Sequence, residues 1–434
     1  MNKKEKLLTA ISATAMLSLG MSMTSLAATG WVQENGNWRY YDRDGYYVTN
    51  EWKKSNNTWY YLDDDGYMAV NELIEDGDRY YAVDASGAMV KNEWREFASE
   101  DDDSETTWYY FQESGKAKDD GFLTIGGNRY HFTDGKMDEG WLQIDDSTYL
   151  LNRNHDGTFG AVLKGWAYVD DFDDNDDVSA EEEGWYYFND NGKMVKDTEK
   201  KINGYYYVFD ENGLMLDNWV KFTKPATASS AEDTIYKFYR TSEGQRVDKW
   251  VYIDDMSEDE GRETEEGWYY FRSGIPYSST YKTTAIADGY GVAKINGKVY
   301  CFDETGRMVT GKIDAKDGTY FYFDDEDGAM KYGKVKIEDA DDLDDGTYYF
   351  VNSGSLGQKG VSYTGVYKGY LYDNGALVKA EDGMRYQKVS VNGKNYMVNE
   401  RGKVITSGTV KDSDGYKWKI EKTTTGDYII TEVN

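Results

Sequence analysis

The chain has 434 residues and a formal net charge of −31, with 80 Asp and Glu against 49 Lys and Arg. Aromatic residues make up 16% of it, with 41 Tyr and 13 Trp, so rings must supply much of the buried surface. This acidity argues against binding to nucleic acid or other polyanions. With 45 Gly and 2 Pro, the composition is typical of many short β-hairpins joined by glycine turns.

The first 27 residues have the features of a secretory signal peptide. Three lysines within the first six residues precede a mostly apolar run from Leu7 to Leu26, and the small residues "SLAA" follow as a cleavage site. We therefore expect residues 1–27 to be removed. The mature chain is then secreted and has no membrane span after signal cleavage.

From residue 30 onward, one motif recurs every 20–22 residues, as in "TWYYLDDDGYM" and "GWYYFNDNGKM". Each unit reads [GE]-W, a variable stretch, W-Y-Y-[LF], a polar turn ending in Gly, and often a Met. Aromatic residues beside Asx-Gly turns predict strand–turn–strand, and both faces of each hairpin are aromatic. Only stacking against other hairpins buries two such faces. The sequence thus predicts an all-β, elongated solenoid of tandem β-hairpin repeats of about 20–22 residues with acidic loop insertions.

Acidic runs interrupt the period, among them "SEDDDSE", "DDFDDNDDVSAEEE", "DDMSEDEGRETEE" and "EDADDLDDG". They lie between hairpin cores, so we expect solvated loops and an uninterrupted stack. One run matches the ligand spacing of an EF-hand through Asp171, Asp173, Asn175, Asp177, Ser179 and Glu182. However, Asp176 replaces the turn glycine, and β-type segments flank the run. No metal ion and no cofactor are therefore predicted.

The last segment differs in composition from the repeats before it. Asn392-Gly393 separates "QKVSV" from "KNYMV", which predicts a tight hairpin, and the strand-like runs "YKWKIEK" and "DYIITEVN" follow. We expect residues 28–380 to form the repeat solenoid, and residues 381–434 to form a degenerate repeat and a β cap. Trp418 would then be a packing residue.

The repeated units resemble the cell-wall-binding repeats of Gram-positive bacteria, of the choline-binding type, which are related to glucan-binding and clostridial toxin repeats. The resemblance covers about residues 30–408. It implies a superhelical stack of hairpins with ligand sites between successive hairpins. In choline-binding members, the leading Trp, the Trp of Trp-Tyr-Tyr and an aromatic residue of the next unit wall a cage. Ring faces attract a quaternary ammonium, and many weak cages hold a polymer by avidity.

Carrying this pattern over residue by residue identifies five sets of candidate ligand walls. They are Trp31 with Trp38 and Tyr61, Trp52 with Trp59 and Tyr81, Trp94 with Trp108, Trp166 with Trp185 and Tyr207, and Trp250 with Trp268. Trp141 and Trp219 take the leading place, with Tyr149 and Tyr236 where the second Trp is expected. Beyond Trp268 the units keep Tyr and Phe but lose the Trp pair, so ligand sites are expected before residue 275.

No catalytic motif accompanies the repeats, and His131, His155 and Cys301 all lie where structural roles are expected. The resemblance therefore implies a secreted, non-enzymatic bacterial surface protein. Its partner would be a cell-wall polymer that bears choline. Two alternatives remain open: a protein that binds glucan or another polysaccharide, and an adhesin or structural surface protein with a host or matrix partner.

Overall fold

The computed structural model describes residues 29–98, 106–170, 182–224, 233–254, 262 and 264–433. The expected signal peptide and the EF-hand-like run over 171–181 lie outside this part. The described chain forms antiparallel β-hairpins, with one short 3-10 turn, η1 (Gly354–Leu356), and no α-helix. The predicted all-β hairpin-repeat fold is confirmed. Two compact units are present: the described residues up to Asp197 with Phe209–Leu214, and Thr198–Val208 with those from Met215 onward.

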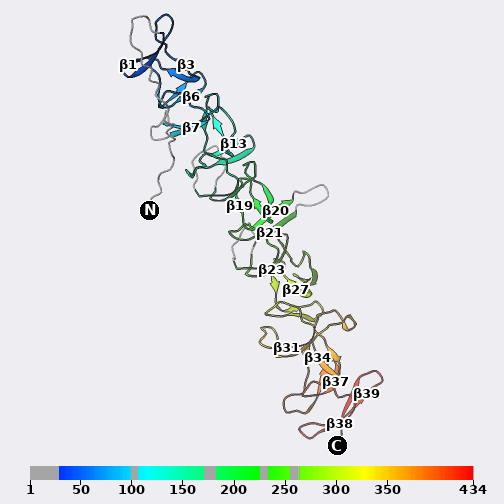
Figure 1. Ribbon diagram of the computed structural model, residues 1–434. Coiled ribbons are helices and arrows are strands. Elements are labelled where there is room, and N and C mark those ends of the chain that lie inside the picture. The colour runs from blue at the N-terminus through cyan, green and yellow to red at the C-terminus, as the bar shows by residue number, and fades with distance from the viewer. Residues whose placement is uncertain are drawn as a thin grey trace, which may run out of the picture. The chain divides into compact units, whose positions relative to one another are not determined.

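In the first unit, consecutive strands pair into hairpins that follow one another in chain order (Figure 1). They are β1 (Gly30–Glu34) and β2 (Asn37–Tyr41), β3 (Glu51–Ser55) and β4 (Thr58–Leu62), β5 (Glu72–Glu75) and β6 (Tyr80–Val83), β7 (Glu93–Ala98) and β8 (Thr106–Phe111), β9 (Leu123–Ile125) and β10 (Asn128–Tyr130), β11 (Phe132–Thr133) and β12 (Lys136–Met137), β13 (Gly140–Ile144) and β14 (Ser147–Leu151), and β15 (Gly165–Val169) and β16 (Gly184–Phe188).

From residue 198 onward, the hairpins alternate with slightly larger antiparallel sheets. The strands are β17 (Thr198–Ile202), β18 (Tyr205–Phe209) and β19 (Met215–Leu216); β20 (Asn218–Lys224) and β21 (Asp233–Tyr239); β22 (Lys249–Ile253), β23 (Gly267–Arg272) and β24 (Ile275–Pro276); β25 (Thr284–Ala287), β26 (Tyr290–Ile295), β27 (Lys298–Phe302) and β28 (Met308–Val309); β29 (Gly311–Asp314) and β30 (Tyr320–Phe323); β31 (Gly333–Ile337), β32 (Gly346–Phe350), β33 (Gly365–Tyr367), β34 (Tyr370–Asp373) and β35 (Ala376–Leu377); β36 (Tyr386–Val391) and β37 (Lys394–Asn399); and β38 (Gly408–Lys411), β39 (Lys417–Lys422) and β40 (Tyr428–Val433).

In several repeats, the polar turn after the hairpin is built by its first acidic or amide residue. After β4, the carboxylate of Asp63 accepts a hydrogen bond from the backbone N–H of Tyr67 at 2.7 Å, and Gly66 closes the turn at φ +76°. The amide oxygen of Asn189 likewise accepts from the N–H of Lys193 after β16. An Asx residue that caps its own turn, followed by a glycine at positive φ, explains this part of the motif.

Successive hairpins are joined by the backbone and by methionine. The N–H of Met68, just after β4, donates to the carbonyl of Trp38 in β2 at 2.8 Å, and Met89 repeats the bond to Trp59 at 2.9 Å. The Met68 side chain then packs on the next turn, where a Cβ on Gly87 would lie 2.7 Å from its Cε. At this step the stack thus needs both the Met and the following Gly, and Gly115 with Met89 repeats the arrangement.

Burial occurs in small clusters between neighbouring hairpins. In one of them, Ala82 of β6 packs with Tyr109 and Phe111 of β8, and all three are buried. Cys301 is fully buried with Phe321 and other apolar side chains, which confirms its expected packing role. Ring-rich clusters of this size replace the single aliphatic core that the composition excludes.

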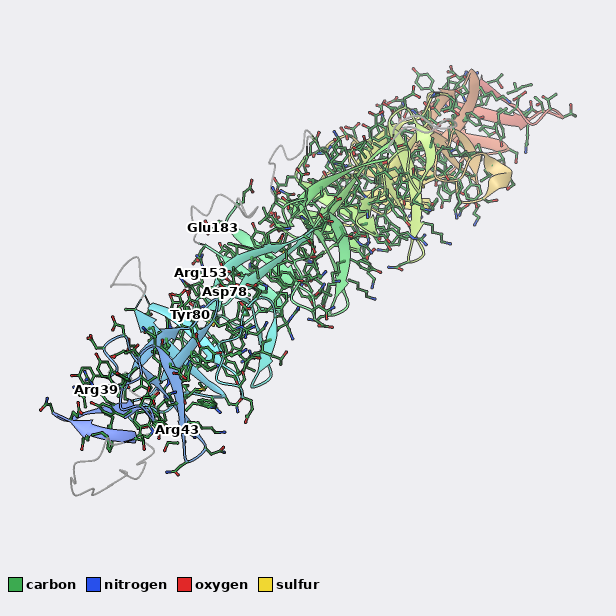
Figure 2. All side chains as sticks on the ribbon, turned by 90° about the horizontal axis from the view of Figure 1, so that it is seen from above. Arg39, Arg43, Asp78, Tyr80, Arg153 and Glu183 are labelled. Carbon is green, nitrogen blue, oxygen red and sulfur yellow. The ribbon has the colours of Figure 1, made fainter. Side chains whose placement is uncertain are left out.

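One face of the first hairpin is covered by a guanidinium stacked between tyrosines of the two following turns. The guanidinium of Arg39 in β2 lies 4.4 Å from the ring centre of Tyr47 and 4.1 Å from that of Tyr67 (Figure 2). In later hairpins the same face packs against the preceding hairpin. Stacking by a guanidinium covers this aromatic surface where the described chain has no earlier repeat.

The C-terminal segment contains the strands that its sequence predicts. Asn392 and Gly393 have φ of +49° and +73° and join β36 to β37 as a tight hairpin turn. Strands β38, β39 and β40 then form a three-stranded sheet. Trp418 donates its indole N–H to Asp412 at 2.8 Å and packs beside Ile420. The capping role of residues 381–434 stays a prediction.

Candidate ligand sites between hairpins

Both tryptophans of a pair project from the same face of one hairpin. In β3 and β4, Trp52 lies opposite Tyr61 and Lys54 lies opposite Trp59, so the two indoles stand two residues apart on one face. The same register holds for the other four pairs. The ring centres of Trp94 and Trp108 are 6.4 Å apart at an angle of 74°. This edge-on arrangement forms an open corner with two ring walls.

The third wall comes from the following hairpin. The leading Trp packs on the first Tyr of the next Trp-Tyr-Tyr segment or on the residue in that place. The measured ring contacts are Trp31 with Tyr60 at 5.4 Å, Trp52 with Tyr81 at 5.3 Å, Trp94 with Tyr130 at 4.9 Å, and Trp250 with Tyr300 at 4.8 Å. One geometric rule therefore describes these steps of the stack, and Tyr81 lies where the sequence predicts it.

This rule shows that two predicted positions are wrong: Tyr61 as the third wall beside Trp31, and Tyr149 in the second Trp place. Tyr60, not Tyr61, lies against Trp31, because Tyr61 points to the opposite face and packs at 5.1 Å on Trp52 of its own hairpin. Tyr149 does not take the second Trp place either. Trp141 pairs with Leu150, so Tyr149 projects from the other face of the hairpin. In both cases a shift of one residue along a strand exchanges the faces.

Two other expected walls have different outcomes. Tyr236 lies opposite Lys221 and takes the second Trp place beside Trp219, as the sequence predicts. Tyr207 belongs to the second compact unit and Trp166 to the first, so their pairing stays a prediction. Within the first unit, Trp166 packs on Trp185 at 6.3 Å and on Phe209 at 5.8 Å.

The second Trp is the most open ring of two pairs. Trp185 is 42% exposed and Trp268 is 46% exposed, although each lies in a strand whose neighbours are largely buried. Large apolar side chains held in place but open to solvent are typical of binding surfaces. These two indoles are therefore the best-placed candidates for contact with a ligand.

The sequence analysis missed an additional tyrosine at each of these two sites. Tyr168 packs at 5.3 Å on Trp185, and Tyr252 packs at 5.4 Å on Trp268. Both are nearly half exposed. The signal that identifies them is the spacing W-x-Y in "GWAYV" and "KWVYI", since residues two apart in a strand share a face.

Each additional tyrosine is held by a carboxylate. The hydroxyl of Tyr168 donates to Glu183 at 2.6 Å, and that of Tyr252 donates to Glu266 at 2.5 Å. This hydrogen bond raises the pKa of both phenols above their usual value. The two sites thus combine open rings with an adjacent negative charge, which favours a cation over an anion.

Several buried indole N–H groups make no hydrogen bond. Within the described part of the chain, the Nε1 atoms of Trp31, Trp52, Trp108 and Trp219 are buried without a hydrogen-bond partner. A buried unsatisfied polar group costs about 1–3 kcal/mol. These indoles are therefore held in place by packing of their ring faces and not by hydrogen bonds of their N–H groups.

The histidine and cysteine side chains have structural surroundings, and no metal-binding cluster is present among the described residues. No group of three or more His, Cys, Asp or Glu side chains in this part is placed to hold a metal ion. His131 contacts Asp138 at 2.5 Å, and burial raises the pKa of Cys301 to about 12. No helix among the described residues is long and apolar enough to cross a membrane.

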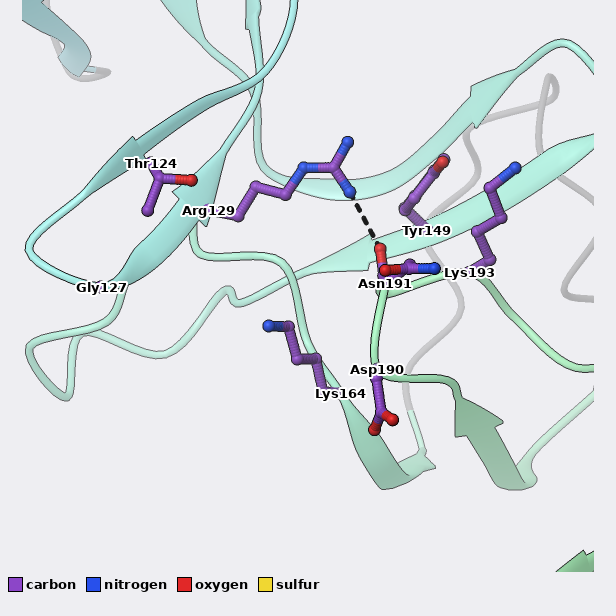
Figure 3. A pocket seen from close by; sticks show the side chains of 8 residues that line it. All are labelled: Thr124, Gly127, Arg129, Tyr149, Lys164, Asp190, Asn191 and Lys193. Carbon is purple, nitrogen blue, oxygen red and sulfur yellow. Dashed lines mark hydrogen bonds between the residues drawn. The ribbon is translucent and has the colours of Figure 1, made fainter.

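One step of the first unit has a cation in place of the second Trp. Thr124 pairs with Arg129, so Phe122, two residues before Thr124, takes the leading place and Arg129 the second Trp place. The Arg129 guanidinium lies 3.4 Å from the ring centre of Phe122. It also donates to the carbonyl of Asn191 at 2.9 Å and lines a pocket of about 540 Å³ (Figure 3).

Two repeat families match segments of the chain. The family described as choline-binding repeat matches residues 48–94 and 290–335. The family described as putative cell wall binding repeat matches residues 29–47, 103–117 and 182–194. These segments include the Trp pairs 31/38 and 52/59, and also residues beyond Trp268.

Glucosyltransferase-I of Streptococcus downei is 26% identical over 350 residues, which cover 71% of this chain and 19% of that protein. The modular autolysin LytC of Streptococcus pneumoniae, in complex with a synthetic peptidoglycan ligand, is 20% identical with a TM-score of 0.38, over 65% of this chain and 52% of LytC. The choline-binding domain of CbpL from the same organism is 28% identical with a TM-score of 0.32, over 44% of this chain and 90% of the domain.

The chain thus spans about half or less of the length of the first two relatives. The protein contains cell-wall-binding repeats of the choline-binding type.

Proposed function

We propose that this chain is a secreted, non-enzymatic protein that binds choline-bearing polymer of a bacterial cell wall through the aromatic sites between its hairpins. The observation that carries the proposal is the repeated corner of two indoles closed by a ring of the next hairpin. Each ring face contributes about 0.5–2 kcal/mol to binding a cation. One site is therefore weak, and several sites on one chain hold a polymer by avidity.

The charge of the chain supports a cationic ligand group. Glu183 and Glu266 each lie beside an exposed Trp–Tyr pair, and the whole chain is strongly acidic. A quaternary ammonium has no N–H to donate, so it needs ring faces and a favourable potential more than hydrogen-bond acceptors. The aromatic corners provide both.

A polysaccharide ligand is the second candidate, supported by the similarity to Glucosyltransferase-I over 71% of the chain. The exposed rings of Trp185 and Trp268 would also stack on a neutral sugar. The two candidate ligands differ in charge. Choline would bind because it is positively charged, whereas a neutral sugar would bind without any charge.

The test is competitive release of the full-length protein from choline-bearing cell walls. Millimolar choline is expected to release it, whereas the uncharged isostere of choline, with carbon in place of nitrogen, is expected to leave it bound. Soluble dextran provides the polysaccharide arm. Release by dextran alone would contradict the choline proposal and favour the second candidate. Release by choline and its isostere at equal concentration would show that charge is not recognised.

A further inference from the structure

The step at Trp219 has all three walls of the aromatic site. Trp219 takes the leading place and Tyr236 the second Trp place of hairpin β20–β21. Tyr269 of β23 is the ring from the next hairpin, with its centre 6.1 Å from that of Trp219. Unlike the leading Trp52 and Trp250, which are part-exposed, Trp219 is only 2% exposed.

A cation of the same chain covers these rings. The guanidinium carbon of Arg262 lies 3.8 Å from the ring centre of Trp219 and 5.5 Å from that of Tyr236. Its Nη2 atom also donates to the carbonyl of Thr305, which holds the side chain in place. Arg262 comes from the segment between β22 and β23, and thus from outside the hairpin that supplies Trp219.

A second step of the stack shows the same substitution independently. In the first unit, the guanidinium of Arg129 lies on the ring of the leading residue Phe122 at 3.4 Å, and 5.8 Å from the third-wall ring of Tyr149. Phe122 and Tyr149 are 5.2 Å apart, within the range of the corresponding contacts at the Trp-pair steps. At both steps the aromatic geometry thus holds a positive charge of the chain itself.

We propose that Arg262 is an internal cation that occupies the aromatic site of the Trp219 step, and that removing its side chain opens this step to a quaternary ammonium. The inference rests on the proposed function for its choice of ligand. A planar guanidinium stacked on an indole uses the same ring quadrupole that attracts a methylated ammonium. Arg262 thereby excludes one step from ligand binding and anchors the segment before β23.

The experiment counts the choline molecules bound by the full-length protein before and after Arg262→Ala. Titration calorimetry is expected to show one more equivalent of choline in the variant than in the wild type. Acrylamide quenching of tryptophan fluorescence is expected to increase on substitution, because Trp219 becomes exposed, and to fall again when choline is added. Arg240→Ala is the matched control, since it removes an exposed arginine of the same unit that pairs with Glu243.

Arg262→Gln keeps part of the side chain without its charge and serves as the second variant if Arg262→Ala does not fold. Arg262→Lys retains a cation and is expected to bind no additional choline. A folded Arg262→Ala or Arg262→Gln protein that binds no more choline than the wild type overturns the inference, whatever the wild type binds. The wild type could bind no choline while the variant binds one equivalent. That result would support the inference and contradict the proposed function.

Discussion

The steps up to Trp268 and those after it share one hairpin but differ in the side chains at two of its positions. In the earlier steps, second-place rings such as Trp185 and Trp268 remain more than two-fifths exposed. In a later step, the second-place ring of Tyr320 in β30 is only 3% exposed and packs against Phe350 of β32. The second-place ring is therefore buried at this later step and open to solvent at two of the Trp-pair steps.

The leading place shows the contrast more directly. The register of β29 with β30 puts Lys312 where Trp31 stands in the first hairpin, and its ammonium lies 5.2 Å from the ring centre of Tyr320. Lys334 takes the same place in β31 and lies 4.9 Å from the ring of Tyr370. At these later steps the leading place thus carries a cation that lies near a ring, whereas at the Trp-pair steps it carries an indole. The difference teaches that one hairpin backbone can carry either an indole or a cation in the leading place.

The largest expected effect comes from removing the second Trp of all five pairs at once. The changes are W38A, W59A, W108A, W185A and W268A. We expect retention on choline-bearing cell walls to fall by at least about 100-fold, because avidity multiplies weak sites. Retention is measured by the fraction bound at fixed wall concentration. The matched control is Y46A with Y416A, which removes exposed rings outside the pairs. Unchanged retention in the five-fold variant would show that the Trp pairs do not distinguish the two regions.

An intermediate effect tests what the two regions share. A Cβ on Gly115 would lie 2.3 Å from Sδ of Met89, and one on Gly328 would lie 2.5 Å from Sδ of Met308. We expect Gly115→Ala and Gly328→Ala each to lower the free energy of unfolding by about 1–3 kcal/mol more than Gly36→Ala. Gly36 also has positive φ but nothing within 4 Å of such a Cβ, so it isolates the backbone cost. Urea denaturation measures the difference. If only one of the two variants lost stability, the packing of a Met side chain on the turn glycine of the next hairpin would not be common to both regions.

The smallest effect concerns a step where ionic contacts take part in place of a Trp pair. Glu199 in β17 accepts hydrogen bonds from Tyr239 at 2.7 Å, Arg246 at 3.0 Å and Lys237 at 3.1 Å. Burial raises its pKa, but these bonds outweigh burial and leave the pKa below the usual value. The stability that Glu199 contributes is therefore present above its unfolded-state pKa and is lost as the pH falls through the folded-state pKa.

We expect Glu199→Gln to lower the urea midpoint at pH 7 and to reduce its fall in acid. Glu421→Gln, which removes an exposed partner of Lys419, is expected to change neither, because exposed pairs contribute little. An acid dependence of the Glu199→Gln protein equal to that of the wild type would assign the effect to other carboxylates.

The sequence by itself determined the hairpins, their period and the turns that close them, because these depend on residues close together in the sequence. Alternation sets which side chains share a face, and Asx-Gly turns such as Asn392–Gly393 close the strands locally. The pairing of Trp94 with Trp108 follows from the same local register, although an acidic run separates them.

Only the tertiary structure decided which face meets which neighbour and which side chain fills a site. Tyr60 and Tyr61 are adjacent and chemically identical, so the motif does not show that Tyr60 packs on Trp31; the direction of stacking decides it. The contact of Arg262 with Trp219 joins residues of different hairpins, and the acidic insertion that carries Arg262 has no repeat register. A local sequence pattern determines each strand and turn. Which side chain fills a site between hairpins depends on contacts between residues far apart in the sequence, and the repeat period does not specify these contacts.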